Sequence, residues 1–236
     1  MSTSHNITTP FKLYYFYTCP YCKPIYYFVR KTNLSHEAIH VNLAKKEQFS
    51  PEFVKINPFS KVPAVIEQNG YILFESSTIL RYLCNTRDVP DHWYPKDPQK
   101  RAQVDLFFDW YQVGSRMIAR YYVSKNPLMY RNMVLNSEEV KKESDNALAE
   151  LERVFLRDRK FLAGDEISLA DIQMLFFFGQ MEVVGYDISK FTKLVEWKNR
   201  MLSTDIRQDY EDFITDTKKR IQEVQHHFDL KNNSKL

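Results

Sequence analysis

The chain has 236 residues, enough to bury a hydrophobic core in each of two domains, and 44% of them are hydrophobic and 27% charged. These proportions are ordinary for a soluble globular protein and exclude a fibre or a largely disordered chain. Lys and Arg number 33 against 30 Asp and Glu, with the two signs interspersed, so the net charge of +3 does not support nucleic-acid binding.

The ends and the cysteine content narrow the class further. Residues 1–10 are expected to form a flexible leader, because they are polar and lack the basic start and apolar centre of a signal peptide. The most apolar stretch, residues 169–178, contains Asp171 and Gln173, so we expect no membrane span. Three cysteines are too few for a disulfide scaffold and favour a reducing compartment.

A βαβ unit is predicted at the start of the chain. The apolar run from Phe11 to Tyr17 indicates a buried strand, residues 24–31 indicate a helix, and the alternation in residues 38–42 indicates a second strand. A right-handed crossover would make the two strands parallel.

The turn Thr18-Cys19-Pro20-Tyr21-Cys22-Lys23 joins the first strand to this helix, and we interpret it as an active-site turn. The positive end of the helix dipole favours thiolate over thiol, so Cys19 is the candidate reactive group. Metal binding through Cys19, Cys22 and the His226-His227 pair is a weaker alternative, because the ligand spacing of a zinc site is missing.

The chain then switches to a hairpin pattern. Residues 51–56 predict a short helix, and residues 62–67 and 71–74 predict two strands whose Asn69-Gly70 pair suits a two-residue primed turn. Glu75, Ser76 and Ser77 are expected to cap a helix that ends near Leu83. The resulting order β-α-β-α-β-β-α is the thioredoxin-like topology.

Beyond a proline-containing linker at residues 88–99 no strand pattern follows, so we predict a thioredoxin-like domain at 11–87 and an all-helical domain at 100–228. The expected helices cover residues 100–117, 137–155, 191–201 and 205–228, with a central, most apolar helix after the capping box Ser168-Leu169-Ala170-Asp171. Residues 229–236 are expected to form a flexible tail.

From about Lys12 to about Leu202 the chain resembles glutathione transferases of the theta class. The residues that carry the resemblance are Asn57-Pro58, Lys61-Val62-Pro63-Ala64, Glu75-Ser76, Trp93-Tyr94-Pro95, Arg101-Ala102, Val104-Asp105 and Ile167 to Asp171. At the reactive position the chain departs from that class, because Cys19 stands where theta enzymes have a serine. Cys-Pro-Tyr-Cys is similar to the motif of glutaredoxins, and a cysteine here resembles omega-class transferases.

The resemblance implies glutathione as co-substrate, no metal, and a specific set of site residues. Val62, before a cis Pro63, would present its backbone to the cysteinyl part of glutathione, and Glu75 and Ser76 would hold the γ-glutamyl group. The remaining residues of the implied site are Lys61, Gln48 near the glycine carboxylate, and Thr18 as the adjacent hydroxyl. The electrophile side would come from Trp110, Tyr111, Arg116, Met117 and the region of Phe176 to Phe178.

Simpler interpretations stand beside these assignments. Glu75 and Ser76 alone would make an ordinary helix cap, Lys61 a solvated turn residue, and the aromatic residues a core. If the site is active, either Cys19 attacks a glutathione mixed disulfide that Cys22 or a second glutathione resolves, or Cys19 or Thr18 stabilises a glutathione thiolate for attack on a hydrophobic electrophile.

Three further expectations concern partners and location. The alternative to an enzyme is a non-catalytic scaffold of the same fold, suggested by the serine-to-cysteine change and the long charged C-terminal helix. The resemblance implies a homodimer in which Asp105 reaches the partner's ligand. The terminal Ser234-Lys235-Leu236 predicts a peroxisomal location through an import receptor, with a cytoplasmic pool as the alternative.

Overall fold

A four-stranded mixed sheet organises the first part of the chain in the computed structural model, which describes residues 7–126 and 135–233. The strands are β1 (Phe11–Tyr15), β2 (His36–His40), β3 (Ala64–Ile66) and β4 (Ile72–Phe74), in the spatial order β2-β1-β3-β4. β1 pairs in parallel with β2 and antiparallel with β3, and β3 pairs antiparallel with β4. This arrangement confirms the predicted thioredoxin-like topology.

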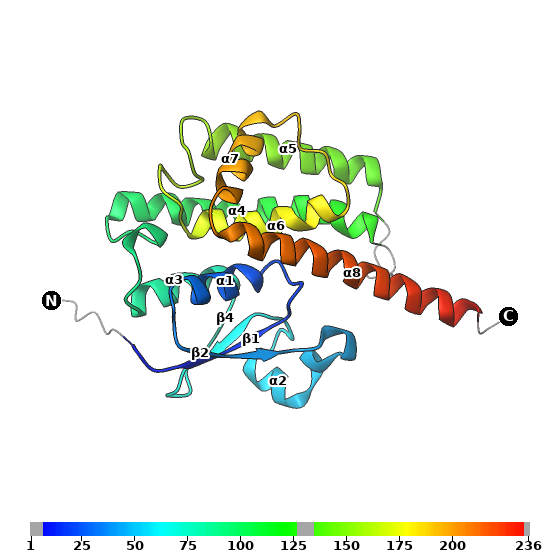
Figure 1. The fold of residues 1–236 in the computed structure, drawn as a ribbon, viewed down its shortest axis with the longest axis horizontal. Helices are drawn as coiled ribbons and strands as arrows, with labels where there is room; N and C mark the ends of the chain where they lie inside the picture. The colour runs from blue at the N-terminus through cyan, green and yellow to red at the C-terminus, as the bar shows by residue number, and fades with distance from the viewer. Residues whose placement is uncertain (1–6, 127–134, 234–236) are drawn as a thin grey trace.

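Three α-helices belong to this sheet: α1 (Lys23–Lys31), α2 (Pro51–Ile56) and α3 (Ser76–Thr86). Pro24 lies in the first turn of α1, where the missing N–H costs no hydrogen bond, and the helix buries Ile25, Phe28 and Val29 as its spacing predicts. Figure 1 shows α1 and α3 between the sheet and the helical domain and α2 on the other side of the sheet. The sheet therefore presents one covered face to the second domain.

The hairpin loop differs from the prediction. The Glu67 N–H donates to the Tyr71 carbonyl at 2.8 Å, which leaves a three-residue loop, and Gly70 alone in it has a positive φ, +85°. A two-residue primed turn of type I′ would require positive φ at both central residues, and Asn69 does not have it. Its side chain instead accepts a hydrogen bond from the Tyr71 N–H at 3.0 Å.

The second domain consists of α4 (Pro98–Lys125), α5 (Ser137–Phe155), α6 (Leu169–Val183), α7 (Thr192–Leu202) and α8 (Ile206–Asn233). Short 3₁₀ turns at Leu43–Lys45, Glu47–Phe49 and Asp91–Trp93 lie in the connections before it. α4 runs two turns beyond the predicted end at Met117, because Ile118, Tyr121 and Tyr122 continue its buried face. The all-helical domain is thus confirmed.

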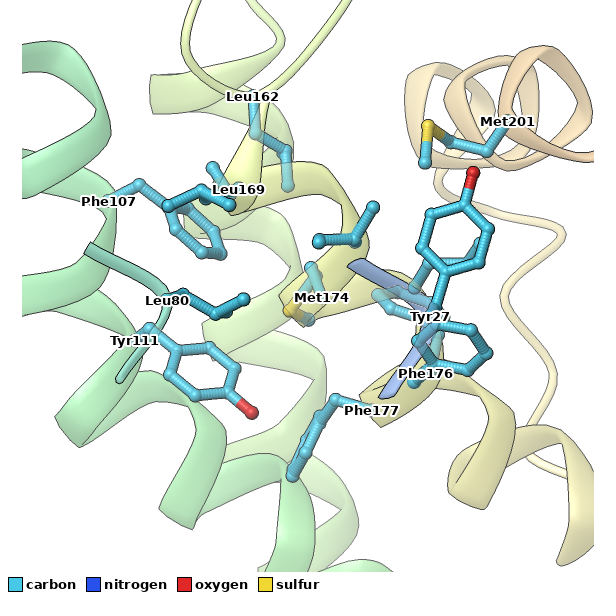
Figure 2. Close-up of a cluster of buried hydrophobic side chains, with 14 of the residues drawn as sticks. Tyr27, Leu80, Phe107, Tyr111, Leu162, Leu169, Met174, Phe176, Phe177 and Met201 are labelled. Atoms are coloured by element: carbon cyan, nitrogen blue, oxygen red, sulfur yellow. The ribbon is translucent and has the colours of Figure 1, made fainter. Parts of the chain in front are cut away.

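α6 lies at the centre, as its composition predicts, and is buried almost all round. Phe176 and Phe177 are at most 1% exposed, and Figure 2 shows them beside Tyr27 of α1 and Tyr111 of α4 respectively. A single hydrophobic cluster includes residues of both domains, so the domains share one core. The relative position of the two domains is therefore fixed by packing.

The predicted capping box starts α6. The fully buried carboxylate of Asp171 accepts hydrogen bonds from the Ser168 N–H at 2.8 Å and the Ser168 hydroxyl at 2.9 Å. Its other oxygen accepts from the Leu162 N–H and the Trp197 indole N–H, both at 2.9 Å. One side chain thus joins the start of α6 to the preceding loop and to α7.

A buried charge pair in the first domain was not predicted from the sequence. Arg87, just after α3, donates through one nitrogen to both carboxylate oxygens of Glu67, just after β3, at 2.8 Å each. Both side chains are only 3% exposed, and the guanidinium also lies over the ring of Phe11 at 5.4 Å. The pair ties the end of β3 to the end of α3.

In the part of the chain that the structure describes, no helix combines the length and apolar character needed to cross a membrane. Over the same residues, no group of three or more His, Cys, Asp or Glu side chains has a metal-binding arrangement. The predicted targeting motif Ser234-Lys235-Leu236 and the first six residues of the predicted leader lie outside the described residues.

Candidate active site

The turn between β1 and α1 is held by successive backbone hydrogen bonds. The Cys19 N–H donates to the Phe16 carbonyl at 3.0 Å, and the Cys19 carbonyl accepts from the N–H groups of Cys22 at 3.1 Å and Lys23 at 3.0 Å. α1 begins at Lys23, so Cys19 lies immediately before its N-terminus. Cys19 is partly exposed, whereas Cys22 is completely buried.

This geometry separates the two thiols chemically. Burial acts to raise the pKa of Cys19, but hydrogen bonds from the Cys22 thiol and from the backbone N–H groups of Tyr21 and Cys22 outweigh it and lower that pKa. Burial, together with the thiol hydrogen bond and the charge of Cys19, raises the pKa of Cys22 well above the ordinary value. Cys19 is therefore the more readily ionised thiol of the pair.

A second segment, residues 57–63, faces the thiol. The peptide bond between Val62 and Pro63 is cis, and the Cys19 sulfur lies 4.0 Å from the Val62 carbonyl oxygen. Asn57, 3% exposed, holds the segment, because its amide donates to the Lys61 carbonyl at 2.7 Å and its oxygen accepts from the Phe59 N–H at 3.0 Å. The Cys19 sulfur and the backbone of this loop are thus fixed opposite each other.

Two adjoining cavities meet at Tyr21, Lys61 and Val62, which line both. The first, of about 450 Å³, contains Cys19 and lies between the domains. The second, of about 270 Å³, lies between the cis-proline loop, the start of α3 and α4. Together they form a site in which a peptide-like ligand and a second molecule would lie on either side of the thiol.

The structure brings together the residues predicted to hold glutathione, with one exception. Gln48 and Thr18 line the first cavity, and the buried Oε1 of Gln48 has no hydrogen-bond partner. Pro63, Glu75 and Ser76 line the second. Glu75 is the N-cap residue of α3 with φ +72°, but its side chain makes no capping hydrogen bond, which corrects the predicted side-chain cap at this position.

Asp105 is the exception, because it lines neither cavity. Its carboxylate accepts from Arg81 at 3.0 Å and from the Tyr94 hydroxyl at 2.9 Å. These partners lie in the middle of α3 and in the linker, so the contacts join the first domain to the start of α4.

On the electrophile side, only Arg116 of the four predicted residues lines a cavity, and it is the second. Tyr111 is 1% exposed and its hydroxyl accepts from Gln173 at 3.1 Å, while Trp110 packs on Phe155 with ring centroids 5.4 Å apart. Met117 is 40% exposed on the surface. None of these three side chains lines either cavity.

Phe176 to Phe178 also lie in the core, at most 2% exposed. Phe177 nevertheless supports the site indirectly, because Tyr21 packs on it at 6.1 Å and on Tyr111 at 6.4 Å between ring centroids. Phe177 and Tyr111 of the core thus hold the ring of Tyr21 next to Cys19.

The helical wall of the first cavity consists of Ala119, Tyr122 and Val123 of α4, Gln180 of α6, and Thr217 and Arg220 of α8. None of these was predicted. The α4 residues lie just past the predicted helix end. On α8, the sequence feature that could have indicated the wall is a threonine and an arginine three positions apart, because residues at this spacing share one helix face. Such a pair is common in a charged helix and does not stand out.

Comparisons with known proteins agree with this geometry. Family profiles described as "Glutathione S-transferase, N-terminal domain" and "Glutathione S-transferase, C-terminal domain" match residues 9–85 and 127–205. Glutathione S-transferase theta-1 of Bos taurus is 36% identical over 190 residues, which span 76% of this chain and 77% of the relative. The theta-1 enzyme of Mus musculus is 38% identical over 156 residues, which span 64% of this chain and 65% of the relative. This chain thus matches slightly less than two thirds of the length of that relative.

Solved structures of glutathione transferases are also similar to this chain. The human theta-class enzyme in complex with the glutathione conjugate of 1-menaphthyl sulfate superposes with a TM-score of 0.85 at 28% identity, covering 93% of this chain and 92% of that one. The apo form of human glutathione-S-transferase T1-1 superposes with a TM-score of 0.80 at 29% identity, covering 93% of this chain and 98% of that one.

The thiol pair yields a first test. Replacing Cys22 by Ala removes a donor to the Cys19 thiolate, so the pKa of Cys19 rises; a hydrogen bond to a charged group contributes about 1.5–3 kcal/mol. Cys22→Ser keeps a donor and gives a lower pKa than Cys22→Ala. Thiolate ultraviolet absorbance against pH, in a Cys84→Ser background, measures both. Equal pKa values in the two variants would contradict a donor role for Cys22.

Proposed function

The chain belongs to the glutathione S-transferase family, and on that premise we propose that it binds glutathione across the two cavities and transfers it through Cys19. The observation that carries the proposal is the convergence of Gln48, Lys61, Glu75 and Ser76 on cavities that meet beside this thiol. Relatives named as theta-class glutathione S-transferases, one of them in complex with glutathione, support it.

Each charged or polar part of glutathione could bind a group of opposite charge or matching hydrogen-bonding character in the two cavities. Ser76 begins α3, whose N-terminal N–H groups and dipole favour a carboxylate, and the exposed Glu75 carboxylate can accept from an ammonium. The Val62 backbone lies where a cysteinyl residue would run past Cys19. Lys61 and Gln48 are available for the second carboxylate.

In the proposed exchange reaction, the Cys19 thiolate attacks the glutathionyl sulfur of a mixed disulfide. A new sulfur–sulfur bond to Cys19 forms as the old one breaks, and the other thiol leaves as a thiolate. The thiolate of a second glutathione then attacks this bond, releases glutathione disulfide and regenerates Cys19. Cys22 is a poor resolving group here, because it is buried and its pKa is raised.

Conjugation is the second chemistry that the site can hold. The buried Thr18 hydroxyl or the Cys19 thiol would donate to a bound glutathione thiolate, which attacks an electrophile in the first cavity. The apolar walls from Val62, Ala119 and Val123 suit a hydrophobic second substrate. The lowered pKa of Cys19 favours exchange, since an ionised thiol donates no hydrogen bond.

Replacing Cys19 by Ser separates the two chemistries. Thiol-transferase activity with a glutathione mixed disulfide should fall at least about a thousandfold, because the covalent intermediate is lost, whereas conjugation should persist or rise. Coupled assays of both activities on the same preparation measure this. If both activities are unchanged, Cys19 is not the reactive group.

The scaffold alternative makes a different prediction for binding. Titration calorimetry with glutathione should detect heat in the wild type, and a Lys61→Ala, Ser76→Ala variant should bind more weakly. No binding at millimolar glutathione would favour a non-catalytic module.

We propose a homodimer as the oligomeric state. α4 carries an exposed apolar stripe, with Leu106 50%, Val113 60% and Met117 40% exposed, and Phe59 of the first domain is 65% exposed. Apolar side chains at this spacing share one helix face, which is typical of an interface. The role of Asp105 toward a partner's ligand stays a prediction.

Light scattering should give twice the single-chain mass of 28.2 kDa. Val113→Glu places a charge in the stripe and should shift the protein to the single-chain mass, while Asp212→Asn, an exposed change on α8, should not. A wild-type protein at 28.2 kDa would rule the dimer out.

Peroxisomal location through Ser234-Lys235-Leu236 also stays a prediction, with a cytoplasmic pool as the alternative. An import receptor reads this tripeptide with its free carboxylate. A fluorescent protein fused before Met1 should give peroxisomal puncta that disappear when Leu236 is deleted. Diffuse fluorescence from both fusions would reject the targeting role.

A further inference from the structure

An ion-pair cluster joins the reactive turn to the far wall of the cavity. Asp209 of α8 receives two cations of α1, with its Oδ1 2.9 Å from Arg30 and 3.5 Å from Lys23. The Lys23 and Asp209 side chains are only 12% and 14% exposed. Asp205, directly before the start of α8, accepts from the Tyr27 hydroxyl at 3.3 Å and pairs with Lys31.

The α1 partners form one stripe, because residues 23, 27, 30 and 31 are spaced for a single helix face. Asp205 and Asp209, four residues apart, form the matching acidic stripe at the start of α8. Figure 1 shows α8 running beside α1 and then on past it. The two stripes therefore fix how α8 lies along α1.

Lys23 is also part of the reactive turn. It directly follows Cys22, and its N–H donates to the Cys19 carbonyl at 3.0 Å. On α8, Thr217 and Arg220 follow Asp209 by eight and eleven residues, which places them two and three turns along on a similar face. Both line the first cavity with Cys19. A single carboxylate thus connects the turn that carries the thiol to the helix that closes the cavity.

α8 has other anchors, both on α6, so loss of Asp209 leaves the helix folded and packed on that neighbour. Phe213 is fully buried against Phe176, and the Tyr210 hydroxyl donates to Glu182 at 2.9 Å. The pair with Lys23 instead decides how closely α8 approaches α1, since a nearly buried lysine without its partner would move toward water and separate the helices.

We propose that Asp209 is a positioning residue that sets the separation between α8 and Cys19, and thereby limits the size of the second substrate. The proposal deepens the proposed function and rests on it only in naming the cavity as the second-substrate site.

The test uses alkylation of Cys19 itself, which needs neither glutathione nor a known substrate. In a Cys84→Ser background, the probes are iodoacetamide as a small reagent and N-phenylmaleimide as a bulky one. The ratio of the bulky to the small rate constant cancels changes in the thiolate fraction. In Asp209→Asn this ratio should rise about fivefold or more, and Asp209→Glu should restore most of the wild-type value.

Asp212→Asn is the matched control, because Asp212 lies on the same helix, is exposed and accepts only from Gln208 among the contacts described. Its rate ratio should equal that of the wild type. If Asp209→Asn does not fold, Asp209→Gln, which also leaves Lys23 without a carboxylate partner, should raise the ratio in the same way.

An unchanged ratio in folded Asp209→Asn, or an equal rise of both rate constants, would overturn the proposal. Calorimetry with glutathione distinguishes this failure from failure of the proposed function. Glutathione affinity should be the same in Asp209→Asn and the wild type, since the predicted contacts that line the cavities lie in the first domain. A changed alkylation ratio without any glutathione binding would reject the function and leave the positioning role intact.

Discussion

The carboxylate of Asp171 is the constraint on which the arrangement of the helical domain depends. It has no contact with water, and its stability there requires the four donors that surround it. These donors come from the loop before α6, the N-cap and α7, so α6 has one axial position. The fixed helix then places Phe177 under Tyr21, and Tyr21 beside Cys19. The geometry around Cys19 in the first domain thus depends partly on a hydrogen-bonded carboxylate in the second.

The two domains contribute different chemistry to the site. The first supplies the thiol, the backbone of the cis-proline loop and most of the polar groups, on short loops held by local hydrogen bonds such as those of Asn57. The second supplies the apolar walls of Ala119 and Val123 together with the polar side chains of Gln180, Thr217 and Arg220. This division lets one part of the site bind a constant ligand while the other varies with the substrate. The completely buried Cys22 belongs to the constant half, where it donates to Cys19.

Sequence patterns predicted the features of the structure that depend on residues close together in the chain. The capping box at Ser168 and Asp171, the turn at Cys19 and the loop before Pro63 depend on neighbours within a few residues, and the structure has each where the sequence indicates. The wall residues on α4 and α8 depend instead on helix rotation and on contacts between residues far apart in the chain. Trp110 and Tyr111 therefore looked like wall residues but face α5 and the core. Nothing in a window around Thr217 or Arg220 indicates that α8 crosses the cavity.

The buried pair of Glu67 and Arg87 has a consequence for how this sequence can diverge. Removing either partner alone would leave a charge at 3% exposure without compensation, at a cost of about 3–5 kcal/mol, a large part of the stability of a typical domain. Replacing both by apolar side chains of similar volume would be close to neutral. Natural variation at these two positions should therefore be correlated, with either both charges present or neither, although they lie 20 residues apart in the chain.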